Sequence, residues 1–260
     1  MVMRVCVLAS GSSGNCTYVG SENTAILIDA GLSGRETASR LDQIGVALSA
    51  IHAVCVSHEH NDHTAGLRVL HRRHHIPVYA NSDTIRALCP DEDRGDISWR
   101  EFENGQAFSI GDFSIAPFSV PHDAMNPVGF VIRRGDVRVA IVTDIGMPTT
   151  LVRECLKGCQ VIIVEANHDE HLLQNSHRPW HLKKRIAGRQ GHLSNETAAT
   201  LLAEIAGAQL EHVYLAHLSA ECNRHDLALK TVQRTLKRHG HERIKVSLTY
   251  PDNISDIWMC

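Results

Sequence analysis

The sequence has no long hydrophobic run. None of its 260 residues belongs to a stretch that approaches the roughly 18 to 20 apolar residues of a membrane span. The apolar run at 5–9 is also too short for the core of a signal peptide. We therefore expect a soluble, cytoplasmic protein. With 43% hydrophobic and 21% charged residues, the chain suits one large domain with a single core, which we expect to span 1–260.

Cysteine pairs and an excess of one charge are also missing. The eight cysteines include no C-x-x-C pair and do not follow the pattern of a small disulfide scaffold, so we expect reduced thiols. The 26 basic and 29 acidic residues leave a formal charge of -3. This balance argues against indiscriminate binding of polyanions over the whole surface, although a local basic face remains open.

Histidine, by contrast, is frequent, and residues 57–63 read SHEHNDH directly after a Val/Ile-rich strand expected at 52–56. His58 and His60 would project to one side and share a metal, while Asp62 and His63 on the next turn would serve a second. Imidazole and carboxylate suit zinc, manganese or iron, and two such ions roughly 3.5 to 4 Å apart can hold a nucleophilic hydroxide. The alternative is a polar loop that is merely rich in histidine.

Along the chain, strands come first and then alternate with helices, without a repeat or a low-complexity linker. Strands are expected at 3–8, 17–19, 25–29, 52–56, 78–80, around 102, and at 107–110, 113–118, 129–133, 137–142, 161–164, 212–215 and 244–248. Helices are expected at 33–43, 64–74, 82–88, 149–156, 194–205 and 226–237. The similar content of the two halves favours an α/β protein with two sheets packed face to face and helices outside.

Three further strands end directly on a residue that can bind a metal. His122 would complete three imidazoles on the first metal, and Asp144 would bridge both ions. His217 would join Asp62 and His63 on the second metal. Each of these residues alone could be a capping Asp or a surface His. Four such strand ends in one chain favour a two-metal site over coincidence.

This order of residues resembles the metallo-β-lactamase superfamily over almost the whole chain. The resemblance implies a four-layer αβ/βα sandwich, in which Asp29 orients the metal loop without binding metal. The alternative for Asp29 is an ordinary strand-ending Asp before a turn. The commonest class of true β-lactamases is secreted and carries Cys where Asp144 stands, so antibiotic hydrolysis is disfavoured.

Two motifs indicate which branch of this superfamily the chain resembles. Residues 164–169 (VEANHD) and 191–194 (GHLS) resemble motifs of the nuclease branch, as in the tRNA 3′-processing ribonuclease. The resemblance implies that Glu165 orients His192, which protonates the leaving oxygen of a phosphodiester. Asp62 is the third residue expected to act in catalysis, by helping to hold the metal pair.

The motifs at 9–15, 121–124, 165–169, 191–195 and 216–219 together resemble the YycJ/WalJ group, metal-dependent DNA exonucleases that attack from the 5′ end. Candidate substrate contacts are Ser12, Ser13, Asn15, Ser194, Ser219 and Asn223. One departure is Cys222, where the group leads us to expect Asn. The 73 positions between Asp144 and His217 (217 − 144) leave no room for the large extra domain of the RNase J branch.

A basic, aromatic-containing segment could add nucleic-acid contacts; it holds Arg178, Trp180, Lys183, Lys184, Arg185 and Arg189. A solvated helix face is the alternative. Overall, we expect a cytoplasmic two-metal phosphodiesterase that acts on DNA rather than RNA. An RNA-processing nuclease, a small-molecule hydrolase of thioesters, lactones or cyclic phosphodiesters, and a binding protein with a structural metal remain the rival functions.

Overall fold

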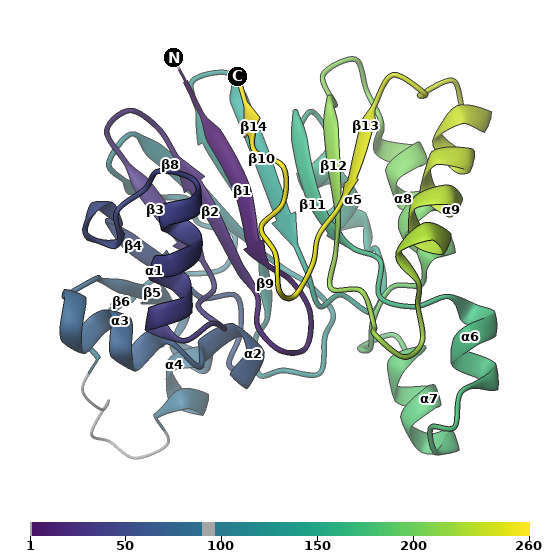
Figure 1. Ribbon diagram of the computed structural model, residues 1–260, viewed down its shortest axis with the longest axis horizontal. Helices are drawn as coiled ribbons and strands as arrows, with labels where there is room; N and C mark the ends of the chain where they lie inside the picture. Colours follow the sequence, from purple (N-terminus) through teal and green to yellow (C-terminus); the bar gives the residue numbers. More distant parts are fainter. Residues whose placement is uncertain (1, 90–96) are drawn as a thin grey trace. The chain divides into compact units, whose positions relative to one another are not determined.

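The computed structural model describes residues 2–89 and 97–260, which form two compact units (Figure 1). Unit 1 contains the chain up to Pro117 together with Ala124–Val128 and Tyr250–Cys260, and unit 2 contains Phe118–Asp123 and Gly129–Thr249. In the described part of the chain, no helix is both long enough and apolar enough to cross a bilayer.

Unit 1 is built on a mixed sheet in the order β14-β1-β2-β3-β4-β5-β6. Its strands are β1 (Arg4–Ala9), β2 (Cys16–Gly20), β3 (Ala25–Ile28), β4 (Ala53–Cys55), β5 (Val78–Ala80), β6 (Trp99–Glu101) and β14 (Trp258–Met259). Neighbours from β14 to β3 are antiparallel, and those from β3 to β6 are parallel. β2, β3 and β4 are buried throughout, as expected for central strands of a covered sheet.

The helices of unit 1 are α1 (Gly34–Gln43), the 3-10 turn η1 (Leu48–Ala50), α2 (Asn61–Thr64), α3 (Leu67–His74) and α4 (Ser82–Leu88). Ser33 and Asn81 cap α1 and α4, because their side chains accept hydrogen bonds from backbone N–H groups three residues later. The core under α1 and α3 includes Leu41, Leu67 and Leu70. A hairpin of β7 (Phe108–Ile110) and β8 (Phe113–Ser119) follows.

Unit 2 repeats the plan of an antiparallel pair followed by parallel strands. Its order is β13-β12-β11-β10-β9, with β9 (Val128–Arg134), β10 (Val137–Val142), β11 (Val161–Glu165), β12 (His212–Ala216) and β13 (Lys245–Leu248). β9 and β10 are antiparallel, whereas β10 to β13 are parallel. Because β10, β11 and β12 are parallel neighbours, residues that follow their carboxyl ends meet at one edge of the sheet.

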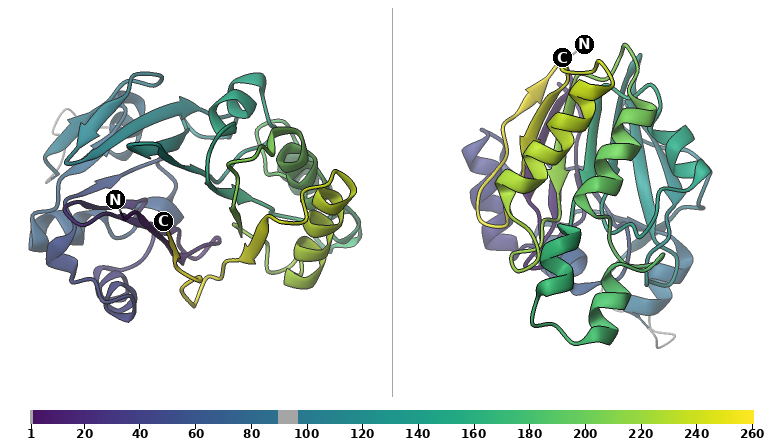
Figure 2. Two further views of the ribbon diagram at one scale, coloured as in Figure 1. Left: turned by 90° about the horizontal axis from the view of Figure 1, so that it is seen from above. Right: turned by 90° about the vertical axis from the view of Figure 1, so that its right-hand side faces the viewer.

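The helices of unit 2 are α5 (Thr150–Leu156), α6 (Glu170–Asn175), α7 (Trp180–Ile186), α8 (Asn195–Ile205) and α9 (His225–Arg238). α8 and α9 lie side by side (Figure 2), and α9 contacts β13. α6 and α7 share a small separate core of Leu173, Ile186 and Cys222, with Leu182 packed against it. Cys222, the departure noted in the sequence, is therefore a buried packing residue.

The sequence predicts most of these elements but misses or merges several. The helix expected at 64–74 begins three residues later, as α3, and the short helix α2 before it was not expected; the two are separated near Gly66. A Cβ on Gly66 would lie 2.1 Å from the carbonyl oxygen of Leu32, so the backbone passes too close to carry a side chain there. The sequence also does not indicate η1, α6, α7 or β14, which are short elements of two to seven residues.

Candidate metal centre

Three of the predicted site residues lie one or two positions after the end of a strand and have an unusual backbone. Asp29, Asp144 and His217 have φ values of 63°, 53° and 54°, in the left-handed region that non-glycine residues rarely adopt. Such conformations cost about 1 to 3 kcal/mol and persist where the surrounding structure enforces them, often at functional sites. The sharp turn at each strand end aims a polar side chain back across the edge of its sheet.

In unit 1, Asp29 holds the metal loop in place. Its Oδ1 accepts a 2.7 Å hydrogen bond from the backbone N–H of Ser57, and its Oδ2 accepts one of 2.9 Å from the Ser57 hydroxyl. Oδ2 also lies 2.8 Å from Nδ1 of His63. Asp29 is 3% exposed and His63 is fully buried, so these bonds are shielded from water. The geometry matches an orienting role for Asp29, while its assignment as such stays a prediction.

These bonds also fix the form of the His63 ring. A carboxylate can only accept, so Nδ1 of His63 carries the hydrogen and Nε2 presents a lone pair. The side-chain amide of Asn15 donates to that Nε2 at 3.1 Å and to Oδ2 of Asp62 at 3.2 Å. Asn15 thus connects the N-terminal turn to two of the residues predicted to bind the second metal, an internal contact that the sequence does not indicate.

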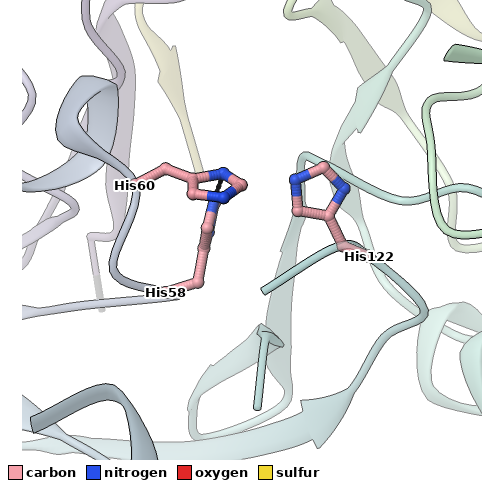
Figure 3. A group of neighbouring side chains, drawn as sticks. All are labelled: His58, His60 and His122. Carbon is pink, nitrogen blue, oxygen red and sulfur yellow. Dashed lines mark hydrogen bonds between the residues drawn. The ribbon is translucent and has the colours of Figure 1, made fainter. Parts of the chain in front are cut away.

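His58 and His60 lie close together on the loop after β4. Nε2 of His58 is 3.0 Å from Nδ1 of His60, and the rings meet edge to face with centroids 4.6 Å apart (Figure 3). Two ring nitrogens at this distance can share a proton or bind one cation. The Ser57 hydroxyl lies 3.0 Å from Nδ1 of His58, so one serine contacts the ring of His58 as well as Asp29.

In unit 2, the carboxylate of Glu165 is the centre of a second cluster. Its Oε1 accepts hydrogen bonds from Nδ1 of His192 at 2.7 Å and Nδ1 of His217 at 2.9 Å. Its Oε2 accepts from the backbone N–H groups of Ile145 and Leu193 at 3.0 and 3.2 Å. Glu165 has no exposed surface, and four donors satisfy its two oxygens.

These contacts set the charges of the pair. Burial alone would raise the pKa of Glu165, but the charge of His192 and the hydrogen bonds from both histidines outweigh it and hold that pKa well below its usual range. Burial alone would lower the pKa of His192, yet the Glu165 carboxylate more than offsets it and the pKa of His192 is raised. Glu165 is thus ionised at neutral pH and favours the protonated form of its partner.

His122 and Asp144 complete the unit 2 cluster. His122, shown in Figure 3, follows the end of β8, and its Nδ1 donates to the carbonyl oxygen of Gly191 at 3.1 Å. Burial lowers the pKa of His122, which favours the neutral ring that a metal ligand requires. Oδ1 of Asp144 lies 3.8 Å from Nε2 of His122 and 3.6 Å from Nδ1 of His217.

The donor set of each unit fits divalent metal ions. Three histidines, His63, His122 and His217, each donate Nδ1–H to an oxygen and so present Nε2, the arrangement that metal-bound histidines commonly show. In unit 2, ligand atoms of Asp144, Glu165, His192 and His217 lie within 4.8 Å of one another. Nitrogen and oxygen ligands without thiolate suit zinc, manganese or iron.

The candidate substrate contacts fall into two groups. Ser12 and Ser13 are exposed at the tip of the turn at 10–15, where a bound strand could reach them. Others make internal bonds: the Ser194 hydroxyl caps α8, the Ser219 hydroxyl accepts from Cys222 N–H, and the Asn223 amide donates to the carbonyl oxygens of Ala166 and Asn167. Their role in substrate binding stays a prediction.

One contact in this region was missed by the sequence analysis. The side-chain amide of Asn167 donates to the carbonyl oxygen of His217 at 2.9 Å, and so it supports the left-handed backbone at that residue. Asn167 stands inside the motif at 165–169, two residues after Glu165. That position is the signal that could have identified it.

Comparisons with known proteins identify the family of this chain. The model of the beta-lactamase superfamily domain matches residues 24–218. The exodeoxyribonuclease YycJ of Bacillus anthracis is 36% identical over 243 residues, which cover 92% of this chain and 91% of YycJ. The exodeoxyribonuclease WalJ of Streptococcus pneumoniae is 35% identical over 233 residues, which cover 88% of this chain and 87% of WalJ.

The fold has a close structural counterpart. The crystal structure of YhfI, a metallo-beta-lactamase fold protein from Bacillus subtilis, matches with a TM-score of 0.76 at 18% identity and covers 100% of both chains. The α/β fold class predicted from the sequence, the metallo-β-lactamase fold, is thereby confirmed. The chain belongs to the metallo-β-lactamase superfamily, and within it to the group that contains YycJ and WalJ.

Proposed function

We propose that this protein is a metal-dependent phosphodiesterase that degrades DNA as an exonuclease from the 5′ end. The observation that carries the proposal is the 2.7 Å hydrogen bond between Glu165 and His192. A hydrolase of esters with good leaving groups has little need of a buried carboxylate that keeps an imidazole protonated. Phosphodiester cleavage needs one, because an alkoxide leaves poorly without a proton. The exodeoxyribonuclease names of the relatives support the same choice.

The two units together would act as one hydrolase domain with two metal ions. We assign His58, His60 and His122 to the first ion, Asp62, His63 and His217 to the second, and Asp144 to both. Divalent ions bound there would lower the pKa of a water molecule and neutralise charge on the phosphate. Asp29 would hold His63 in the tautomer that presents Nε2.

His192 is suited to act as the general acid. Its Nδ1 is occupied by Glu165, so its Nε2 is the nitrogen that can meet a substrate, and 22% of its side chain remains exposed while Glu165 is fully buried. As hydroxide attacks phosphorus in line, the bond from phosphorus to the leaving oxygen breaks, and that oxygen takes the Nε2 proton and departs as an alcohol. Glu165 stays ionised throughout and stabilises the imidazolium before the transfer.

The experiment compares two histidine variants by metal analysis and by digestion of end-labelled single-stranded DNA. His60→Ala should lose metal and activity together. His192→Ala should keep its metal content and lose about 10²- to 10⁴-fold in turnover, the usual contribution of a general acid. His239→Ala, at an exposed residue that ends α9, is the matched control and should change neither measurement.

Two results would contradict the proposal. Turnover of DNA by His192→Ala at the parental rate would remove the general-acid role. The parent protein would instead be a small-molecule hydrolase if it hydrolysed thioesters or lactones with zinc, manganese or iron but left DNA intact with all three metals.

A further inference from the structure

We propose that residues 170–191, the α6–α7 excursion, form a binding surface for single-stranded nucleic acid, on which Trp180 stacks a base and exposed cations meet phosphates. The inference rests on the proposed nuclease function and adds to it a place where the strand is gripped. α6 and α7 extend as a pair from the rest of unit 2 (Figures 1 and 2).

The first observation is an exposed aromatic side chain. Trp180 begins α7 and is 67% exposed, more than any other large apolar side chain that the structure describes. Nζ of Lys184, one helical turn later, lies 5.3 Å from the ring centroid, a cation–π distance. An indole face with a cation beside it is the combination that single-strand binding proteins present to a base and its phosphate.

The second observation is the charge of the excursion. Residues 170–191 hold five Lys and Arg, three His and one acidic residue, Glu170, whereas the whole chain carries a formal charge of -3. Arg178 and Arg185 are tied to acidic partners elsewhere in unit 2, Glu221 and Asp123. Lys184 and Arg189 are exposed, so this surface offers positive charge to a polyanion.

The third observation is the rigid connection between this surface and the proposed general acid. The base of the excursion is closed by a parallel bridge between His168 and Ser194. The backbone N–H of His192 donates to the carbonyl oxygen of Ile186, the last residue of α7, at 2.8 Å. A Cβ on Gly191 would lie 2.2 Å from that same oxygen, so the two segments are in direct backbone contact.

A cavity lies beside this connection. Its volume is about 200 Å³, and Leu173, Gln174 and Ala187 of the excursion line it together with His168 and His192. A water molecule occupies about 30 Å³ of liquid, so the cavity has room for one ring-sized group. A single-stranded nucleic acid held on Trp180 would have this cavity as a recess for a sugar or base, next to His192, the residue proposed to protonate the leaving oxygen.

The test measures tryptophan fluorescence with oligothymidylate in EDTA, so that binding is read without cleavage. The chain has three tryptophans, and Trp180 is far more exposed than Trp258, which is 7% exposed. Stacking should quench the emission, and Trp180→Phe should abolish most of the quench. Binding of a dye-labelled oligonucleotide should weaken about 5- to 140-fold in Trp180→Ala, the equivalent of about 1 to 3 kcal/mol per stacked base. Trp180→Phe, which keeps an aromatic face, should restore most of it.

Two lysine variants, one on the excursion and one on α9, provide a matched comparison. Lys184→Gln should lower the dependence of affinity on salt, whereas Lys230→Gln, on an exposed lysine of α9 paired with Asp226, should not. A quench that persists in Trp180→Phe, or an equal quench by duplex DNA, would overturn the proposal. Because no metal is present, these results are independent of whether the parent hydrolyses bis(p-nitrophenyl) phosphate, which tests the phosphodiesterase function separately.

Discussion

Nδ1 of His192 lies 2.7 Å from Oε1 of Glu165, and the same oxygen accepts a hydrogen bond from Nδ1 of His217 at 2.9 Å. One buried carboxylate oxygen therefore serves the proposed general acid and a proposed metal ligand at once. A change at Glu165 must alter both proton transfer and metal binding, which makes the pH dependence of the reaction informative.

The first prediction concerns that pH dependence in Glu165→Gln. Glu165 raises the pKa of His192, so the imidazolium persists to higher pH in the parent protein. A general acid works only while protonated, so activity should fall as pH rises through this pKa. Removing the negative charge of Glu165 lowers the pKa of His192, so the alkaline limb of the kcat/KM profile should move to lower pH. An unmoved limb would mean that another group is titrating.

The second prediction concerns Asp29→Ala. The change leaves Ser57 N–H, the Ser57 hydroxyl and Nδ1 of His63 without their shared acceptor. Buried donors left unsatisfied cost about 1 to 3 kcal/mol each, and loss of an orienting partner typically weakens metal binding 10- to 100-fold. Chelator competition and thermal melting of the metal-free protein would measure both effects. Asp226→Ala, at an exposed helical residue, should show neither effect.

Much of the site could be predicted because its residues stand shortly after the ends of apolar strands. His122, Asp144 and His217 each follow such a strand, as the sequence indicated. Parallel pairing of β10, β11 and β12 then brings Asp144, Glu165 and His217 to one edge of a sheet. The periodicity of apolar residues carries this information, because buried parallel strands are continuous hydrophobic runs.

What the sequence could not give are contacts between residues far apart in the chain. Asn15 donates to Asp62 and His63, nearly fifty positions away, and no local pattern encodes that partner. The left-handed backbone of Asp144 and His217 was equally hidden, since neither residue type requires it. α7 was read only as a basic segment, because its apolar residues are too few for a helical period.

The third prediction tests the close approach under the metal loop. A Cβ on Gly31 would lie 1.7 Å from the carbonyl oxygen of Asp62 and 2.6 Å from the backbone nitrogen of Asn15. Gly31→Ala should force the loop away, destabilise the fold by about 1 to 3 kcal/mol and reduce metal affinity. Gly207→Ala meets only the end of the Gln209 side chain at 3.2 Å and is the matched control. Equal midpoints of urea unfolding for Gly31→Ala and Gly207→Ala would show that a side chain at residue 31 causes no steric strain.

The fourth prediction isolates the backbone cost at Asp144. Both Asp144→Gly and Asp144→Ala remove the carboxylate, but only glycine adopts the left-handed conformation freely. The glycine variant should therefore be more stable by about 1 kcal/mol, measured by guanidinium unfolding without metal. At Thr200, an exposed residue in the middle of α8, the order should reverse, because glycine costs about 1 kcal/mol relative to alanine in a helix interior. The same order at both positions would argue against strain at residue 144.

The bridge between His168 and Ser194 closes the base of the α6–α7 excursion, residues 170–191, and we expect this excursion to act as an exchangeable cassette that stops short of His192. Its two ends are fixed beside the proton donor and that donor's carboxylate, while α6 and α7 rest on a hydrophobic cluster of their own. Natural variation could lengthen, shorten or recharge this cassette and leave the reaction chemistry intact. Grafting a different cassette between those anchors is a direct way to redirect the enzyme towards another polymer.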